Sequence, residues 1–171
     1  QLKVADGRTE GSQIGPLITP QAFKKVEEHV EDAVEKGAKI LTGGTSDNSG
    51  VQFYKPTVLT DINNNMKIYY EETFGPVAPI IKFKDENEVI EMANDTKYGL
   101  AGYFYSRDIG KIWRVAEALE YGMVGINAGV ISTEVAPFGG IKESGIGREG
   151  AEEGIEEYLE IKYLCFDGVE K

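Results

Sequence analysis

The chain has 171 residues, enough for a domain with a real core, and its 41% hydrophobic and 27% charged residues are typical of a globular protein. Its formal net charge of −11 argues against a nucleic-acid-binding groove and an anionic membrane surface as partner, because both require clustered lysine and arginine. The single cysteine excludes an intrachain disulfide and fits a reducing compartment, the cytoplasm, while a single histidine argues against a metal site and no apolar run could span a membrane.

Residues 19–37 predict an amphipathic helix. Thr19 can accept a hydrogen bond at the N-cap, and Pro20 suits the first helical turn. Apolar residues at positions 23, 26, 30 and 34 form one face, and Gly37 can end the helix in the left-handed conformation. His29 lies among glutamates, so we expect it on the solvated face without a catalytic role.

Strands and helices then alternate as far as residue 127. Asp85 and Asp108 each precede a helical pattern that they can cap, Asp85 and Glu88 have the spacing of a capping box, and Gly122 is expected to end the second helix. Pro56 indicates an edge strand or a bulge. This alternation predicts an α/β fold, a mostly parallel sheet with helices on both faces. The predicted strands are 38–43, 52–62, 78–83, 100–106 and 123–127.

A long glycine-rich loop, residues 128–150, follows the alternating part. Loops of this length in a compact domain are usually functional or disordered. Within it, GIGREG matches G-x-G-x-x-G through Gly145, Gly147 and Gly150. A dinucleotide fingerprint requires a strand before it and a helix after it in a βαβ unit. Neither is present, so we expect these glycines to form tight turns.

The segment YLEIKYLCF, Tyr158 to Phe166, reads as a last strand. Little chain remains to fold back over it, so we expect this strand to pair outside its own domain. Cys165 lies within it, with no histidine nearby in the sequence and no helix start to lower the pKa of its thiol. We therefore expect a packed thiol and not a nucleophile.

The stretch EETFGPV permits two interpretations of Glu72 and Phe74. In the first, Phe74 is part of the core and Glu72 is solvated. In the second, a turn at the sheet edge directs both side chains at a ligand. A carboxylate can accept two hydrogen bonds from a ribose diol, and an aromatic ring can pack on a flat heterocycle. The residues by themselves leave both interpretations open.

Several motifs together resemble the aldehyde dehydrogenase family along the whole chain. IGPLIT, EETFGPV, YGLAG, NAG and PFGGIKESGIGREG occur here in the family's order. The ending GIEEYLEIKYLC, with GVIS before PFGG, is most similar to succinate-semialdehyde dehydrogenases. The resemblance implies the fold of that family's catalytic domain, NAD or NADP as cofactor, and an aldehyde substrate, with succinic semialdehyde as the first candidate.

The resemblance also assigns roles to four residues. Glu72 matches the glutamate that binds the nicotinamide ribose hydroxyls, and Phe74 matches the aromatic residue that positions the nicotinamide. Phe138 matches an aromatic residue that lines the aldehyde tunnel, and Ser132 matches a serine that helps to hold the substrate's carboxylate. The final strand is similar to the family's oligomerisation strand, which implies a homodimer or homotetramer.

The family's cysteine nucleophile and general-base glutamate lie upstream of IGPLIT, and the adenine-binding domain is missing too. The resemblance therefore implies no catalytic residue here, and we expect the chain alone to be inactive. Because the first residue is Gln1 and not methionine, we expect a piece of a longer protein. Residues 1–157 would be the C-terminal part of the catalytic domain, and 158–171 the oligomerisation strand and tail.

Two alternatives stay open at this point. The intact enzyme could act on another aldehyde, because GVIS is a short motif and most of the tunnel is missing. The chain could also be a naturally truncated, non-catalytic interaction module that keeps the oligomerisation strand. The two classes differ in whether the parent reading frame continues upstream through a cysteine nucleophile.

Overall fold

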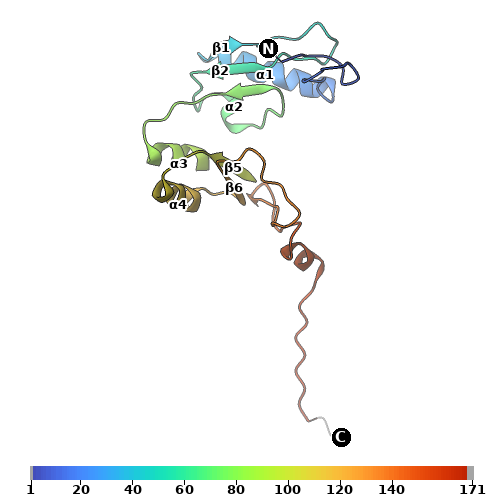
Figure 1. Cartoon of the computed structure of the whole chain (residues 1–171), viewed down its shortest axis with the longest axis vertical. Helices are drawn as coiled ribbons and strands as arrows, with labels where there is room; N and C mark the ends of the chain where they lie inside the picture. Colours follow the sequence, from blue (N-terminus) through green and yellow to red (C-terminus); the bar gives the residue numbers. More distant parts are fainter. Residues whose placement is uncertain (1, 169–171) are drawn as a thin grey trace. The chain divides into compact units, whose positions relative to one another are not determined.

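The computed structural model describes residues 2–168, and the chain divides into two compact units, Gln1–Phe83 and Lys84–Lys171 (Figure 1). The first unit contains α1 (Pro20–Glu35), β1 (Lys39–Thr42), β2 (Thr57–Thr60), α2 (Lys67–Tyr70) and β3 (Val77–Pro79). Its strands form one sheet in the order β1-β2-β3, where β1 is antiparallel to β2 and β2 is parallel to β3.

Helix α1 begins and ends where the sequence predicts. The hydroxyl of Thr19 accepts a hydrogen bond of 3.1 Å from the Ala22 amide, and Pro20 is the first helical residue. Gly37 has a φ of 101°, in the left-handed region that favours glycine, and the Ala38 amide donates back to the Ala33 carbonyl. These bonds satisfy backbone groups that both ends of a helix otherwise leave unpaired.

The prediction for His29 is wrong, because its side chain is buried with only 2% of its surface exposed. Val26, His29, Val30 and Ala33 are the buried residues of α1. They follow one another at spacings of three, one and three, which place them on one face of a helix. The glutamates on either side of His29 suggested a polar face, whereas its spacing from Val26 and Ala33 puts it in the buried stripe.

The core of the first unit lies between α1, β2 and α2. Leu59 and Met66 are fully buried there, and the edge of the Phe23 ring packs on Tyr54 with 5.8 Å between ring centroids. Burial and the neighbouring Glu27 and Glu31 raise the pKa of Tyr54 to about 12. The buried cluster consists of Val26, Val30, Ala33, Ala38, Tyr54, Leu59, Ile62, Met66 and Ile68.

The second unit has two small sheets and two helices that contact each other. The elements are α3 (Glu86–Asn94), β4 (Tyr98–Gly99), β5 (Ala101–Phe104), α4 (Ile109–Ala118), β6 (Met123–Ile126), β7 (Ile141–Lys142) and the 3₁₀ helix η1 (Glu153–Tyr158). β5 and β6 are parallel, whereas β4 and β7 are antiparallel. Arg114 on α4 binds both carboxylate oxygens of Glu86 on α3, at 2.9 and 3.2 Å.

Both aspartate caps of this unit are confirmed. The Asp85 carboxylate accepts from the Glu88 amide at 3.0 Å, and the Asp108 carboxylate accepts from the Lys111 amide at 3.0 Å. The capping box is shifted by one residue, because the Glu88 carboxylate binds the amide of Lys84 and not that of Asp85.

The predicted end of α4 at Gly122 is wrong, since the helix ends at Ala118. The Asn94 side chain stops it by donating to the Ala118 carbonyl and accepting from the Glu120 amide, both at 2.8 Å. Gly122 has another use, because a Cβ there would lie 2.0 Å from the Gly139 carbonyl oxygen. The glycine therefore permits a close approach of two backbone segments.

The α/β class is confirmed, but the strand pairing is more mixed than predicted, with two parallel and two antiparallel pairs in three separate sheets. Pro56 immediately precedes the central strand β2, where its missing amide costs no ladder hydrogen bond, so the edge alternative is wrong. The other alternative, a bulge, agrees with the register shift between Ile40 and Thr42 in the pairing of β1 with β2. The strand expected over 78–83 is short, since β3 ends at Pro79 and Phe83 is exposed.

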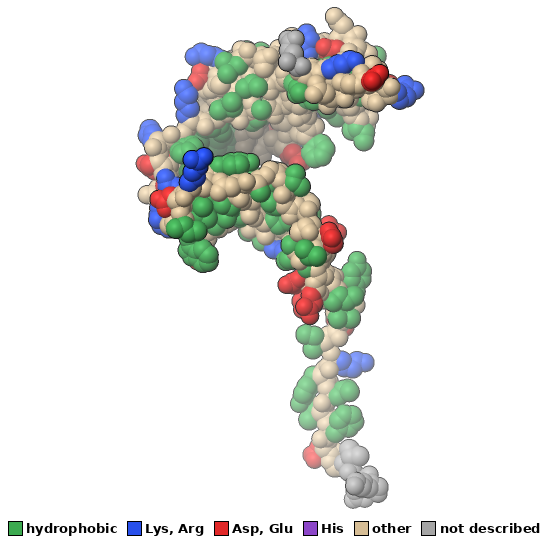
Figure 2. All heavy atoms as spheres, viewed as in Figure 1, with side chains coloured by type: hydrophobic (Ala, Val, Ile, Leu, Met, Phe, Trp, Pro, Cys, Tyr) green, Lys and Arg blue, Asp and Glu red, His purple; other side chains and the backbone are tan. Residues whose placement is uncertain are grey.

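After η1, residues 159–168 pair with no strand in the described part of the chain. Their hydrophobic side chains are exposed, with Ile161 fully so (Figure 2). Cys165 is also exposed, so the expected packed thiol is wrong within this chain. Residues 169–171 lie outside the described residues, and the boundary at residue 157 and the oligomerisation strand stay predictions. Across residues 2–168, no helix has the length and apolar character that crossing a bilayer requires.

Candidate functional site

The segment from Glu71 to Gly75 is attached to α1 through alternate residues. The two ring nitrogens of His29 lie 3.2 Å from the Glu71 carboxylate and 3.1 Å from the Thr73 hydroxyl. At Gly75 the backbone comes so close to α1 that a Cβ would lie 2.4 Å from a methyl carbon of Val26. Positions 71, 73 and 75 therefore contact the helix.

The residues between these anchors, Glu72 and Phe74, are exposed. Among residues 2–168 the Glu72 carboxylate has no hydrogen bond or ion pair, and 81% of the Phe74 surface is accessible. Phe74 has a φ of 48°, in the left-handed region that a residue with a side chain rarely adopts. An unpaired carboxylate beside an open aromatic face has the chemistry that a ribose diol next to a flat heterocycle requires.

In the second unit, the glycine-rich loop closes on itself. Phe138 and Glu149 exchange two backbone hydrogen bonds of 2.7 and 2.8 Å, which join PFGG to GREG. All three glycines of GIGREG have φ between 72° and 120°, which confirms that they form turns. A Cβ at Gly139 would lie 2.5 Å from the Gly147 carbonyl oxygen, so the two segments approach closely.

Ser132 and Phe138 line a common hollow of about 430 Å³ on this loop. Ser132 is exposed, and its hydroxyl has no hydrogen-bond partner in the described part of the chain, so it is free to bind a ligand. No lysine or arginine is in the lining, and the nearby Arg148 guanidinium donates to the Gly140 and Gly147 carbonyls. The remaining lining residues are Thr133, Glu134, Glu149 and Gly150.

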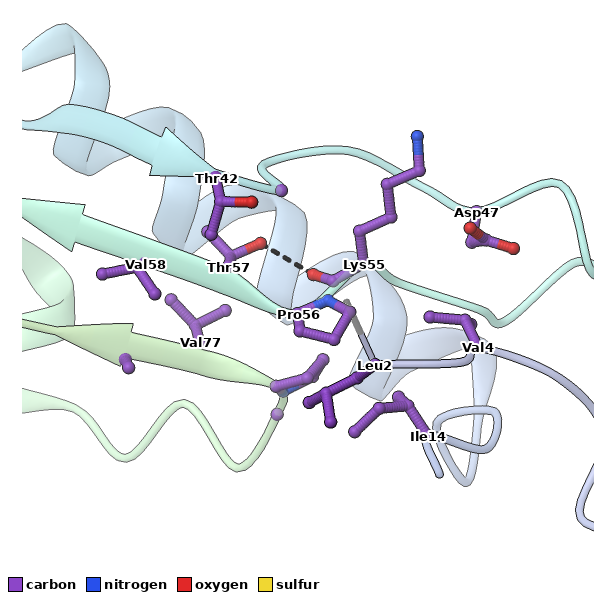
Figure 3. A pocket seen from close by; sticks show the side chains of 14 residues that line it. Leu2, Val4, Ile14, Thr42, Asp47, Lys55, Pro56, Thr57, Val58 and Val77 are labelled. Carbon is purple, nitrogen blue, oxygen red and sulfur yellow. Dashed lines mark hydrogen bonds between the residues drawn. The ribbon is translucent and has the colours of Figure 1, made fainter. Parts of the chain in front are cut away.

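A larger hollow, of about 850 Å³, lies in the first unit and has none of the four predicted site residues in its lining. Figure 3 shows Leu2 and Ile14 on one side of it and Val77 on another, so its walls are largely apolar. Thr57 also lines the hollow, with its hydroxyl donating to the Lys55 carbonyl at 2.7 Å (Figure 3). In residues 2–168, no cluster of three or more His, Cys, Asp or Glu could hold a metal ion.

The structure thus places Glu72 with Phe74 on one unit and Ser132 with Phe138 on the other. Reasoning from the sequence missed the anchors His29 and Thr73. The spacing of His29 from Val26 was available as a signal, whereas its contact with residues more than forty positions away was not.

Three bacterial dehydrogenases are among the curated relatives whose sequences are more than half identical to this chain. The succinate-semialdehyde dehydrogenase [NADP(+)] GabD of Escherichia coli is 59% identical over 96% of this chain. A glutarate-semialdehyde dehydrogenase of Pseudomonas putida is 61% identical over 96% of the chain, and a 3-sulfolactaldehyde dehydrogenase of Pseudomonas putida is 55% identical over 99%. The chain spans only 34–35% of the length of these relatives.

Solved structures agree with these relatives. A crystal structure of succinate-semialdehyde dehydrogenase from Burkholderia pseudomallei superposes with a TM-score of 0.93 at 58% identity, over 96% of this chain and 34% of that one. Residues 1–164 match the sequence profile of the aldehyde dehydrogenase family. Because this match includes both units and the motifs at both candidate sites, the chain belongs to the aldehyde dehydrogenase family.

Proposed function

We propose that this chain is the C-terminal part of an NAD(P)-dependent enzyme that oxidises an aldehyde with a distal anionic group, succinic semialdehyde being the first candidate. The observation that carries the proposal is the 59% identity to a succinate-semialdehyde dehydrogenase along almost the whole chain. The names of the other two relatives point to glutarate semialdehyde and 3-sulfolactaldehyde. All three aldehydes share a carboxylate or sulfonate at the far end.

Glu72 and Phe74 bind the nicotinamide end of the cofactor in this proposal. The Glu72 carboxylate accepts hydrogen bonds from the two ribose hydroxyls, and its lack of protein partners leaves its oxygens available. Phe74 presents its ring to the flat nicotinamide. When bound, the nicotinamide supplies the hydride acceptor for the oxidation. These two residues hold and orient it and exchange no proton.

Ser132 and Phe138 contact the aldehyde. The Ser132 hydroxyl donates a hydrogen bond to the substrate's anionic group, and Phe138 packs on its methylene chain. Glu134 and Glu149 line the same hollow without any basic side chain. In this proposal the positive charge that would favour an anion therefore comes from residues beyond this lining. The family's nucleophile and general base lie outside this chain.

The test uses the full-length protein that contains this chain. We would measure kcat/KM with NAD and with NADP for succinic semialdehyde, glutaric semialdehyde, 3-sulfolactaldehyde and butanal, which has no anionic group. We expect at least one anionic aldehyde to exceed butanal by roughly tenfold or more, the worth of one charge-assisted hydrogen bond. Equal values for butanal and all three anionic aldehydes would overturn the substrate class. No oxidation of any of them would instead favour the non-catalytic module.

A further inference from the structure

We propose that His29 is a positioning residue for the cofactor site, because it fixes the backbone that presents Glu72 and Phe74. This inference rests on the proposed function, since it concerns how the residues assigned to the nicotinamide are held. His29 itself is buried in α1 and turned towards the anchoring residues, so it does not touch the cofactor.

The imidazole of His29 is fully engaged by the segment. A carboxylate accepts hydrogen bonds, so the ring nitrogen Nε2 donates to Glu71 at 3.2 Å. The other nitrogen, Nδ1, pairs with the Thr73 hydroxyl at 3.1 Å. Glu71 and Thr73 flank Glu72 on both sides. A single buried side chain thus fixes the residues before and after the proposed ribose ligand.

The burial of His29 makes these bonds consequential. Burying a polar ring without hydrogen-bond partners is unfavourable. A hydrogen bond that is lost in the interior therefore costs more free energy than a hydrogen bond at the surface contributes. The other core residues around α1 are hydrophobic, and the fully buried Leu59 and Met66 are examples of side chains that fill this core by packing alone. A histidine in this stripe is accounted for by the segment it binds and not by the core.

The conformation of Phe74 indicates why such fixing is required. A non-glycine residue in the left-handed region persists when its surroundings over-determine it. His29 holds Thr73 on one side of Phe74, and the close contact between Val26 and Gly75 holds the other. If the His29 bonds are lost, Phe74 can relax to an ordinary φ, and its ring then turns away from the nicotinamide.

The test compares variants of the full-length protein. His29→Phe keeps an aromatic ring and removes both hydrogen bonds, while His29→Asn can keep the contact near Nδ1 and His29→Gln the contact near Nε2. The matched control is Thr57→Val, which also removes two hydrogen bonds of a buried polar side chain in the same unit. The Thr57 hydroxyl accepts from the Gly44 amide and donates to the Lys55 carbonyl, and it forms no hydrogen bond with residues 71–75. Only the Thr57 backbone amide, which the substitution keeps, donates to the Pro76 carbonyl after the segment.

We expect His29→Phe to raise the KM and the dissociation constant of the nicotinamide cofactor roughly tenfold, the effect of one or two net hydrogen bonds on the bound pose. The KM for the aldehyde should change little, and so should the affinity for ADP, which lacks the nicotinamide ribose. His29→Asn and His29→Gln should recover part of the loss. Amide hydrogen exchange of residues 71–75 should quicken in His29→Phe and not in Thr57→Val.

Two outcomes separate this inference from the proposed function. If Glu72→Gln weakens cofactor binding and His29→Phe behaves like Thr57→Val, then the proposed cofactor site is supported and His29 is only a packing residue. If Glu72→Gln has no effect on cofactor binding, the proposed role of the segment fails. Unchanged hydrogen exchange at residues 71–75 in His29→Phe would overturn the inference in either case, because the exchange measurement does not depend on catalytic activity.

Discussion

The residues of the segment Glu71–Gly75 form two groups, those that contact α1 and anchor the segment and those whose side chains are exposed. Residues 71, 73 and 75 contact α1, while Glu72 and Phe74 remain exposed. The sequence resemblance names the displayed residues, and the structure explains how the chain keeps them in place. The first two predictions concern side chains of this exposed kind.

Glu72→Gln in the full-length protein should disturb the cofactor more than the aldehyde. The neutral amide weakens the charge-assisted bonds to the ribose by about 1–3 kcal/mol, so the nicotinamide leaves its productive pose and hydride transfer slows. Pre-steady-state formation of the reduced cofactor measures this step. Glu91→Gln, a change at an exposed glutamate on α3, is the control. An unchanged burst in the Glu72 variant would show that this carboxylate is not at the ribose.

Ser132→Ala should discriminate between aldehydes. Loss of a hydrogen bond to a charged group costs about 1.5–3 kcal/mol, which is roughly ten- to a hundred-fold in kcat/KM for succinic semialdehyde. A neutral aldehyde of similar length should lose little, and the comparison cancels general damage to the loop. We would measure kcat/KM for both aldehydes in both proteins. Equal losses would mean that Ser132 has only a structural role.

At the scale of single residues, motifs in the sequence pointed to exposed side chains and missed buried anchors. Residues within a motif such as EETFGPV are adjacent, so their pattern is visible. His29 was expected in solvent because its neighbours in the sequence are charged, and its partners Glu71 and Thr73 lie 42 and 44 residues away. Which side chain satisfies a buried ring depends on packing that no local pattern records.

Helix ends show the same division between local and distant determinants. Thr19, Asp85 and Asp108 cap the helices that directly follow them, as their sequence positions predict. The end of α4 was wrong because Asn94, from another helix, supplies both hydrogen bonds there. The strand pairing was wrong in part for the same reason, since a strand's partner is set by the whole sheet.

Helix α2 receives its cap from α1. Its own N-cap, Met66, forms no side-chain bond, and the Asp32 carboxylate instead accepts from the Lys67 amide at 2.8 Å. The same carboxylate pairs with Lys36 at 2.6 Å. The side chain of Lys36 and then the Lys67 amide lower the pKa of Asp32 below its usual 3.8.

Asp32→Ala should therefore destabilise the chain by about 1 kcal/mol at neutral pH, the typical worth of a helix cap. Because the pKa of Asp32 is lower in the folded state, its contribution is complete above pH 3.8 and disappears as the pH falls through the folded value. Urea unfolding at several pH values checks this. Asp32→Asn, which keeps an acceptor, should lose less. A difference between wild type and Asp32→Ala that persists at the lowest pH would contradict the argument.

The two units of the whole molecule differ in their interiors. Among the described residues, all buried hydrophobic side chains but Val115 belong to the first unit. The second unit exposes Trp113 and Ile146, and residues 159–168 add a row of hydrophobic side chains (Figure 2). A surface of this kind usually contacts another protein surface.

The isolated chain should consequently self-associate. Sedimentation over a wide concentration range should show species larger than a monomer, and Ile161→Asp should reduce them, because a charge on an unpaired segment opposes edge-to-edge pairing. Glu160→Asp, next to it, is the control. A clean monomer at every concentration would count against this expectation.

The isolated chain should also oxidise no aldehyde. It offers residues that bind and orient, but the family's cysteine nucleophile is not among them, and the exposed Cys165 does not match it. Formation of reduced cofactor from succinic semialdehyde, compared with a blank without protein, measures this. Turnover above the blank by the pure chain would refute it.

The alternation in Glu71–Gly75 also restricts how the length of this segment can change. Inserting one residue after Glu71 would bring Glu72 and Phe74 to positions that face α1 and leave Thr73 in solvent, because anchored and exposed positions alternate along this segment. Inserting two residues would return Glu72 and Phe74 to exposed positions but would displace Gly75 from its contact with Val26. A stretch anchored at every second residue is thus far less tolerant of gained or lost residues than of exchanged ones.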